Sequence, residues 1–183
     1  MPFPPDVFRC TDLNRFIIEE TSYDKDEMKK LHDANYSKLN VEQMKVYQSV
    51  INSIEHDKGR LFFVHDSGGC GKTFIWKTIC CRLRSEIKIV LPVASSGIAS
   101  TLLPGGRMAH SRFHIPLKLY QNSTAGIKHG TNIVELLHHT SLIIWDESSM
   151  QHRRAFECVD QSLCDIMSYV NPARAKKPIG GIH

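Results

Sequence analysis

The residues with the clearest chemical potential form a glycine-rich run at positions 67–71, followed directly by Lys72 and Thr73. Glycines let successive backbone N–H groups point at one anion, and a helix that begins there adds the positive end of its dipole. Lys72 can reach the outer phosphates of a nucleotide, and the Thr73 hydroxyl can ligate Mg²⁺. The run therefore predicts a site for ATP and Mg²⁺, although a glycine-rich turn without function is the alternative. The predicted loop residues are Gly68, Gly69, Cys70 and Gly71.

One position departs from the full phosphate-loop pattern, which begins with glycine where this chain has Asp66. An aspartate adopts left-handed backbone angles more readily than most residues. Its negative charge beside phosphate groups is still unfavourable. We therefore expect Asp66 to lower the affinity for nucleotide, and the loop could be degenerate.

A pair of carboxylates, Asp146 and Glu147, follows the apolar run 142–145. In sheets of parallel strands, ligands bind at the carboxyl ends of the strands. Asp146 can hold Mg²⁺ through water, and Glu147 can orient or deprotonate an attacking water. Acidic pairs are also common in turns, and the phosphate loop upstream favours the catalytic interpretation. Lys72 and Glu147 are thus the predicted catalytic residues, and the chemistry is ATP hydrolysis.

Three apolar runs, at 61–64, 87–94 and 142–145, predict strands that are covered on both faces. Pro92 should weaken the end of the second run, because proline donates no ladder hydrogen bond. Helices should alternate with these strands, at 40–57, 72–84 and 95–103, and a last amphipathic helix carries Phe156, Val159, Leu163 and Ile166. This alternation predicts a three-layer α/β fold with a mainly parallel sheet.

Residues 1–38 look different from the rest, with two short predicted helices at 12–20 and 24–34 in an acidic, polar leader that is helical or partly disordered. The net charge is −3 over residues 1–58, +7 over 59–118 and zero after that. The basic middle third suits a polyanion, such as a nucleotide or a nucleic-acid backbone. A solvated basic face is an equally weighted alternative.

Composition excludes several classes of protein. The 183 residues are 42% hydrophobic and 23% charged, which is typical of one globular domain. We find no apolar run long enough to cross a bilayer and no signal peptide, so we expect an intracellular protein without a membrane partner. The six cysteines have neither zinc-site nor disulfide-framework spacing, which indicates reduced structural thiols.

The phosphate loop and acidic pair, together with three further stretches, resemble the Pif-type DNA helicases, a 5′→3′ branch of helicase superfamily one. The stretches lie at 39–43, 93–100 and 106–113, and the resemblance spans about residues 39 to 168. The plant branch, including helicases related to Helitron transposons, is the most similar. The resemblance implies that residues 39–183 form the first RecA-like motor lobe, truncated and without the second lobe whose arginines complete the ATP site.

The same resemblance implies roles for individual residues. Gln43 corresponds to the glutamine that recognises adenine, while its spacing from Asn40 also predicts a helix-capping box. Five residues correspond to contacts with single-stranded DNA, with loop and helix-capping chemistry as the alternative explanation for them. Phe113 could stack on a base or pack inward. The five residues are Ser95, Ser96, Gly97, His110 and Ser111.

The predicted function is therefore an ATP-dependent 5′→3′ DNA helicase that acts in the nucleus in DNA repair, recombination and telomere maintenance. Its implied ligands are ATP, Mg²⁺ and single-stranded DNA. The alternative is a non-catalytic module that binds nucleotide or DNA. A small-molecule kinase is a third possibility, which Glu147 beside Asp146 disfavours because that carboxylate suits hydrolysis.

Overall fold

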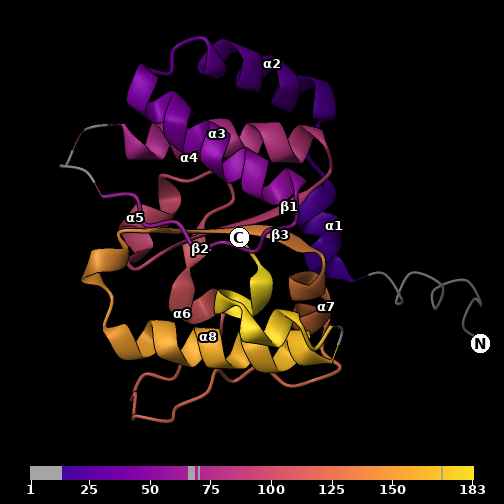
Figure 1. The fold of residues 1–183 in the computed structure, drawn as a ribbon, viewed down its shortest axis with the longest axis vertical. Coiled ribbons are helices and arrows are strands. Elements are labelled where there is room, and N and C mark those ends of the chain that lie inside the picture. The colour runs from indigo at the N-terminus through magenta and orange to yellow at the C-terminus, as the bar shows by residue number, and fades with distance from the viewer. Residues whose placement is uncertain (1–13, 66–68, 70, 170) are drawn as a thin grey trace, which may run out of the picture.

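The computed structural model describes residues 14–65, 69, 71–169 and 171–183, and its centre is a three-stranded parallel sheet in the order β2-β1-β3 (Figure 1). The strands are β1 (Ile89–Ala94), β2 (Arg107–Met108) and β3 (Thr140–Asp146). The β1–β3 register runs from Ile89 opposite Thr140 to Ala94 opposite Asp146. Both long strands therefore end at the same edge of the sheet.

Helices cover both faces of this sheet, as the predicted three-layer α/β fold requires (Figure 1). One face carries α3 (Val41–Glu55) and α4 (Lys72–Ser85), with α2 (Lys25–Tyr36) packed outside them. The other carries α6 (Ala109–Arg112), α7 (Asn132–His138) and α8 (Arg153–Ser168). The remaining elements are α1 (Arg15–Thr21), α5 (Gly97–Thr101) and the 3-10 helices η1 (Ser148–Met150), η2 (Arg174–Lys176) and η3 (Pro178–Gly181).

The core divides along the two faces of β1, whose successive side chains point to opposite sides. Ile89, Leu91 and Val93 pack with α6, α7 and α8, whereas Val90 packs with α3 and α4. The expected last helix forms as α8, and it buries Val159, Leu163 and Ile166. Within the described residues, no helix is both long and apolar enough to cross a membrane.

The predicted strand at 61–64 is absent from the sheet, so this prediction was wrong. Leu61 is 70% exposed and Phe63 is 74% exposed, whereas a covered strand would bury both. A strand needs a neighbour for its backbone groups, and among the described residues no strand pairs with residues 61–65. The Ile143 N–H of β3 donates to the carbonyl of His183 at 2.7 Å, rather than to a neighbouring strand formed by residues 61–64.

Pro92 does not weaken β1 as expected, because the strand continues through it to Ala94 in the centre of the sheet. The short partner β2 pairs only with Val93 and Ala94. Pro92 is opposite Ile144 of β3 and opposite no residue of β2. Its missing N–H therefore interrupts no pairing with β2.

Tyr47 on α3 links the second core cluster to α2, because its hydroxyl lies 2.8 Å from His32 Nε2. Burial raises the pKa of Tyr47 to about 12 from 10.0. The neutral phenol therefore contributes stability that is complete below pH 10 and is lost as the pH rises towards 12.

We predict that Tyr47→Phe unfolds more easily than the wild type at pH 9, because it lacks the hydrogen bond to His32. It should then lose less stability than the wild type between pH 9 and pH 11.5. Urea denaturation of both proteins at the two pH values measures the difference. Burial also raises the pKa of Cys80 to about 12. Because Cys80 is present in both proteins, its effect on stability cancels when the two losses are compared. Parallel losses in the two proteins would contradict this assignment.

Candidate active site

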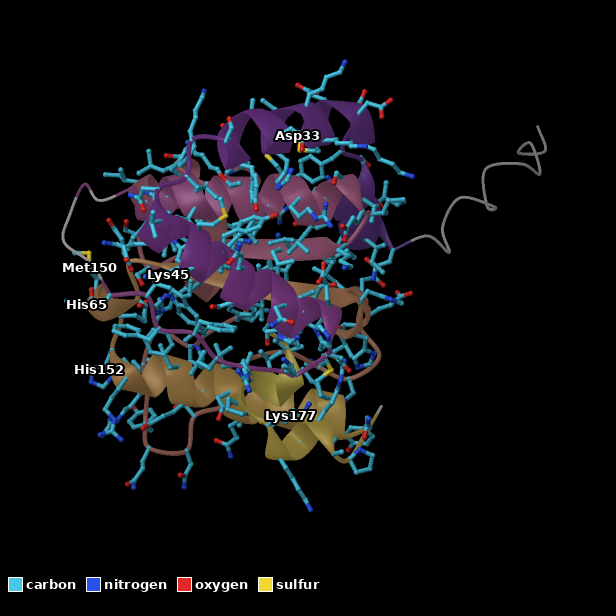
Figure 2. All side chains as sticks on the ribbon, turned by 45° about the horizontal axis from the view of Figure 1, so that its top comes forward. Asp33, Lys45, His65, Met150, His152 and Lys177 are labelled. Atoms are coloured by element: carbon cyan, nitrogen blue, oxygen red, sulfur yellow. The ribbon has the colours of Figure 1, made fainter. Side chains whose placement is uncertain are left out.

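Three segments meet at the edge of the sheet where β1 and β3 end. These are the start of α4, the residues after β1 that lead into α5, and the turn from β3 into η1 (Figure 1). Figure 2 shows His65, Met150 and His152, which flank these segments in the sequence, on one side of the molecule. The fold thus brings together the phosphate-loop helix, the acidic pair and one predicted DNA segment.

The phosphate loop is described in part, because Asp66, Ser67, Gly68 and Cys70 lie outside the described residues. Gly69 has φ +85° and Gly71 has φ +80°, which are left-handed angles that favour glycine. Gly71 is the N-cap of α4, so Lys72 and Thr73 occupy the first turn of a 14-residue helix. A glycine N-cap in front of a long helix is the arrangement that a phosphate-binding loop requires, and phosphate binding here stays a prediction.

Gln43 lies against this loop. A Cβ at Gly71 would come within 2.7 Å of Gln43 Nε2, so the amide occupies the space that glycine leaves. The predicted capping box is also present: Gln43 N–H donates to Asn40 Oδ1 at 2.8 Å, and Asn40 N–H donates to Gln43 Oε1 at 3.1 Å. The capping box fixes the Gln43 side chain next to Gly71, and recognition of adenine by Gln43 stays a prediction.

The acidic pair ends β3 in an unusual backbone conformation. Glu147 has φ +52° and ψ +36°, a left-handed conformation that is uncommon for a residue with a side chain. Its N–H donates to Asp146 Oδ1 at 3.1 Å. Asp146 is half-buried and Glu147 is exposed. The Asp146 side chain is therefore less accessible to solvent than that of Glu147.

The donor set at this edge fits Mg²⁺ held mainly by substrate and water. In the described part of the chain, no group of three or more His, Cys, Asp or Glu side chains could hold a metal alone. Mg²⁺ ordinarily takes one or two protein oxygens and fills its remaining positions with phosphate oxygens and water. The hydroxyl of Thr73 and the carboxylate of Asp146 are oxygen ligands of that kind.

The predicted DNA segment after β1 is bonded to the acidic turn. Ser95 Oγ donates to the Glu147 carbonyl at 3.0 Å, and Ser96 Oγ donates to Glu147 Oε2 at 3.4 Å. Ser96 is also the N-cap of α5 and accepts from the Ala99 N–H at 3.2 Å. Gly97 is exposed at the first position of α5.

The second predicted DNA segment forms α6, where His110 is half-buried and Ser111 is exposed. Phe113 follows this helix and is 0% exposed. Of the two alternatives for Phe113, the structure takes inward packing, because its ring stacks on Trp145 with centroids 5.9 Å apart. With its ring buried in this way, Phe113 presents no face to a DNA base in this structure.

Trp145 is a residue that sequence reasoning missed, because it was counted only as part of an apolar run. Its indole Nε1–H donates to Ser95 Oγ at 3.2 Å, and its ring packs between Phe113 and Phe156. A tryptophan directly before an acidic pair was the available signal, since a buried indole N–H requires an acceptor.

A parallel sheet with a glycine-capped helix and an acidic pair at its carboxyl edge defines a phosphate-loop nucleotide-binding protein. Residues 38–183 match the family described as PIF1-like helicase, and the chain belongs to this family of DNA helicases. The match begins after α1 and α2, so both N-terminal helices lie outside it.

Individual relatives agree with the family. The chain is 30% identical over 129 residues to the ATP-dependent DNA helicase PIF4 of Trypanosoma brucei brucei, covering 68% of this chain and 15% of that protein. It is 30% identical over 126 residues to the ATP-dependent DNA helicase Pif1 of a Psychrobacter species, covering 68% of this chain and 18% of the relative. The chain thus spans less than a fifth of the length of either relative.

Solved structures show the same RecA-like α/β fold. The Pif1 helicase from Bacteroides in complex with ADP-AlF3 and single-stranded DNA superposes with a TM-score of 0.63 at 28% identity, over 79% of this chain and 30% of that one. A structure of two coordinating Pif1 helicases at forked double-stranded DNA gives a TM-score of 0.62 at 28% identity, over 79% and 32%. The predicted fold class is thereby confirmed.

Proposed function

We propose that this chain is the ATP-binding and DNA-binding first motor lobe of a 5′→3′ DNA helicase, with the lobe beginning at residue 39. The hydrogen bonds from Ser95 and Ser96 to Glu147 carry the proposal. They join a predicted DNA-contacting segment to the residue best placed to act on water.

In this proposal the chain's own residues divide the work of hydrolysis. The phosphate loop and Lys72 hold the phosphates, and Thr73 and Asp146 would hold Mg²⁺, which neutralises phosphate charge when bound. Glu147 accepts a proton from water, the water oxygen bonds to the γ-phosphorus, and the bond to the bridging oxygen breaks. The products are ADP and inorganic phosphate. Gln43, beside Gly71, recognises the adenine edge.

Single-stranded DNA lies across the same edge, along Ser95, Ser96, Gly97, His110 and Ser111. Hydroxyl and backbone N–H groups are common donors to DNA phosphates, and such contacts position the strand without reading its sequence. The net charge of +7 over residues 59–118 supports this, because both segments fall inside that block. Repair, recombination and telomere maintenance in the nucleus, and a place in the plant or Helitron-like branch, are part of the proposal through the resemblance alone.

The 183-residue chain should bind ATP·Mg²⁺ and single-stranded DNA, hydrolyse ATP slowly and unwind no duplex. A second lobe that contributes an arginine in trans can be worth ~10³–10⁵ in rate. Titration calorimetry with ATP·Mg²⁺, fluorescence anisotropy with labelled oligothymidylate and single-turnover hydrolysis test these expectations. Fast DNA-stimulated turnover by the monomer would contradict the need for a second lobe. Binding with no hydrolysis above that of Glu147→Gln would favour the non-catalytic alternative.

A further inference from the structure

The segment after β1 is fastened to the end of β3 by four hydrogen bonds. Two involve Ser95 as donor, from its N–H to the Asp146 carbonyl at 3.4 Å and from its hydroxyl to the Glu147 carbonyl at 3.0 Å. The Trp145 indole donates to Ser95 Oγ at 3.2 Å. The fourth bond, from Ser96 Oγ to Glu147 Oε2 at 3.4 Å, is the only one of the four that reaches a carboxylate.

The Ser96 hydroxyl has one proton to donate. One of its two lone pairs accepts the Ala99 N–H that caps α5, which fixes the oxygen in place. The O–H therefore donates its hydrogen bond either to the Glu147 carboxylate or to another anionic acceptor at the same position, such as a DNA phosphate. A carboxylate oxygen that accepts this bond is drawn towards α5 and is not directed at a water molecule.

The second DNA segment connects to the same place by packing. Phe113, at the end of α6, stacks on Trp145, and Trp145 donates to Ser95. A displacement of α6 would therefore be transmitted through two aromatic rings to the segment that holds Glu147. Both predicted DNA segments are thus connected to the turn that carries Glu147.

We propose that Ser96 is a positioning residue that holds Glu147 in an unproductive orientation until a phosphate of single-stranded DNA replaces Glu147 as the acceptor of its hydroxyl hydrogen bond. The inference rests on the proposed function and adds a mechanism of regulation to it. DNA binding releases the carboxylate to act on water, so hydrolysis depends on DNA. Ser95 and Trp145 form the scaffold that keeps Ser96 within reach.

Three variants separate this role from a purely structural one. Ser96→Gly removes the hydroxyl but keeps a residue that is tolerated at an N-cap. Ser96→Thr keeps the donor, and Thr101→Ala removes a hydroxyl that bonds only within α5, to the Ile98 carbonyl. Single-turnover hydrolysis of ATP·Mg²⁺ by excess protein is compared with and without saturating oligothymidylate.

In Ser96→Gly, hydrolysis without DNA should rise by up to about tenfold, of the order that one ordinary hydrogen bond provides. The stimulation by DNA should fall towards one. Ser96→Thr and Thr101→Ala should keep the wild-type ratio. If Ser96→Gly hydrolyses ATP more slowly both with and without DNA, at an unchanged ratio, Ser96 does not restrain Glu147 and the inference is overturned.

A second measurement needs no catalysis. The chain has two tryptophans, and in a Trp76→Phe background the remaining indole N–H resonance reports on Trp145 and its bond to Ser95. Oligothymidylate should shift this resonance, and an unshifted resonance at saturating DNA would overturn the inference. Failure of the wild type to bind ATP or DNA would overturn the proposed function as well, whereas normal binding with no change in the ratio would overturn the inference alone.

Discussion

Lys72→Ala should abolish detectable ATP binding, whereas Glu147→Gln should retain binding and lose hydrolysis. Lys72 lies in the first turn of α4 behind Gly71, where its charge stabilises the bound phosphates before any chemistry occurs. Glu147 acts on the attacking water, so its loss falls on the chemical step, and the proton-transfer contribution is ~10²–10⁴-fold. Calorimetry with ATP·Mg²⁺ and single-turnover hydrolysis measure the two effects separately.

Lys77→Ala is the matched control, because Lys77 lies on the same helix further from the phosphate loop. It should bind ATP about as well as the wild type, since a charge beyond the first turn is more strongly screened. If Glu147→Gln weakened ATP binding as much as Lys72→Ala does, the two roles would have been assigned wrongly. If Lys77→Ala did the same as Lys72→Ala, the effect of Lys72 would be one of net charge.

The parts of the fold that could be predicted from the sequence are governed by neighbours in the chain. The capping box at Asn40 and Gln43 needs only residues three apart, and it forms as expected. Gly71 was expected in a turn that requires glycine, and its left-handed backbone angle agrees with that. The final helix followed from the spacing of its apolar residues, three of which are buried.

The parts that could not be predicted depend on partners distant in the sequence. The apolar run 61–64 has the composition of a strand, but a strand exists only where another strand accepts its hydrogen bonds. The inward packing of Phe113 depends on Trp145, which lies 32 positions later and whose ring it stacks on. The hydrogen bonds from Ser95 and Ser96 to Glu147 likewise join residues about fifty positions apart, and no local sequence pattern predicts them.

Glu20 illustrates the same limit, because the acidic leader gave no sign that one of its carboxylates is buried. Glu20 on α1 is 6% exposed and contacts Arg112 of α6, and its second oxygen lies 3.7 Å from Arg84 of α4. Both arginines are buried, at 4% and 3% exposure. Burial lowers the pKa of Arg112, and the Glu20 carboxylate opposes that shift.

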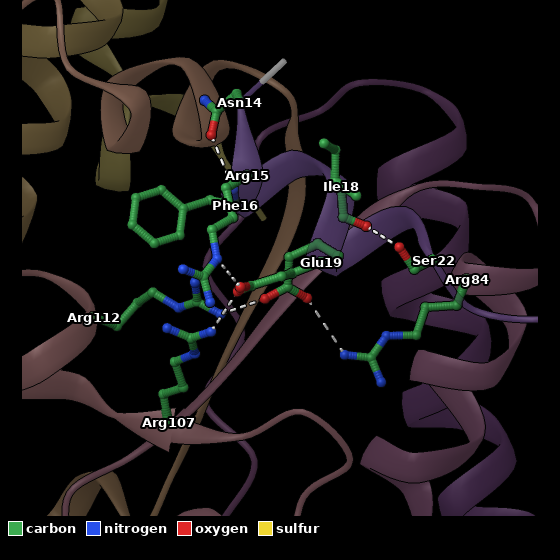
Figure 3. A network of polar contacts seen from close by, with 10 residues as sticks. Asn14, Arg15, Phe16, Ile18, Glu19, Ser22, Arg84, Arg107 and Arg112 are labelled. Carbon is green, nitrogen blue, oxygen red and sulfur yellow. Dashed lines mark hydrogen bonds and ion pairs between the residues drawn. The ribbon is translucent and has the colours of Figure 1, made fainter. Parts of the chain in front are cut away.

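The neighbouring carboxylate provides a natural comparison (Figure 3). Glu19 binds Arg15 at 2.8 Å and Arg107 at 2.9 Å, but these side chains are substantially exposed. Figure 3 shows the arginines of three different elements, Arg84, Arg107 and Arg112, converging on the carboxylates of α1. Exposed pairs of this kind contribute ~0–1 kcal/mol, because water and salt screen them.

Glu20→Ala should therefore lower the free energy of unfolding by ~3–5 kcal/mol, since it leaves two buried guanidinium groups without their counter-ion. Glu19→Ala, next to it on α1, should cost no more than ~1 kcal/mol. Urea denaturation at pH 7 measures both. The double variant Glu20→Ala/Arg112→Ala should cost less than the two single variants together, because it removes one of the unpaired charges. Equal, small losses for Glu19→Ala and Glu20→Ala would show that α1 is a dispensable attachment. The expected difference would instead show that α1 is an integral part of the fold, although it precedes both the family match and the proposed lobe boundary at residue 39.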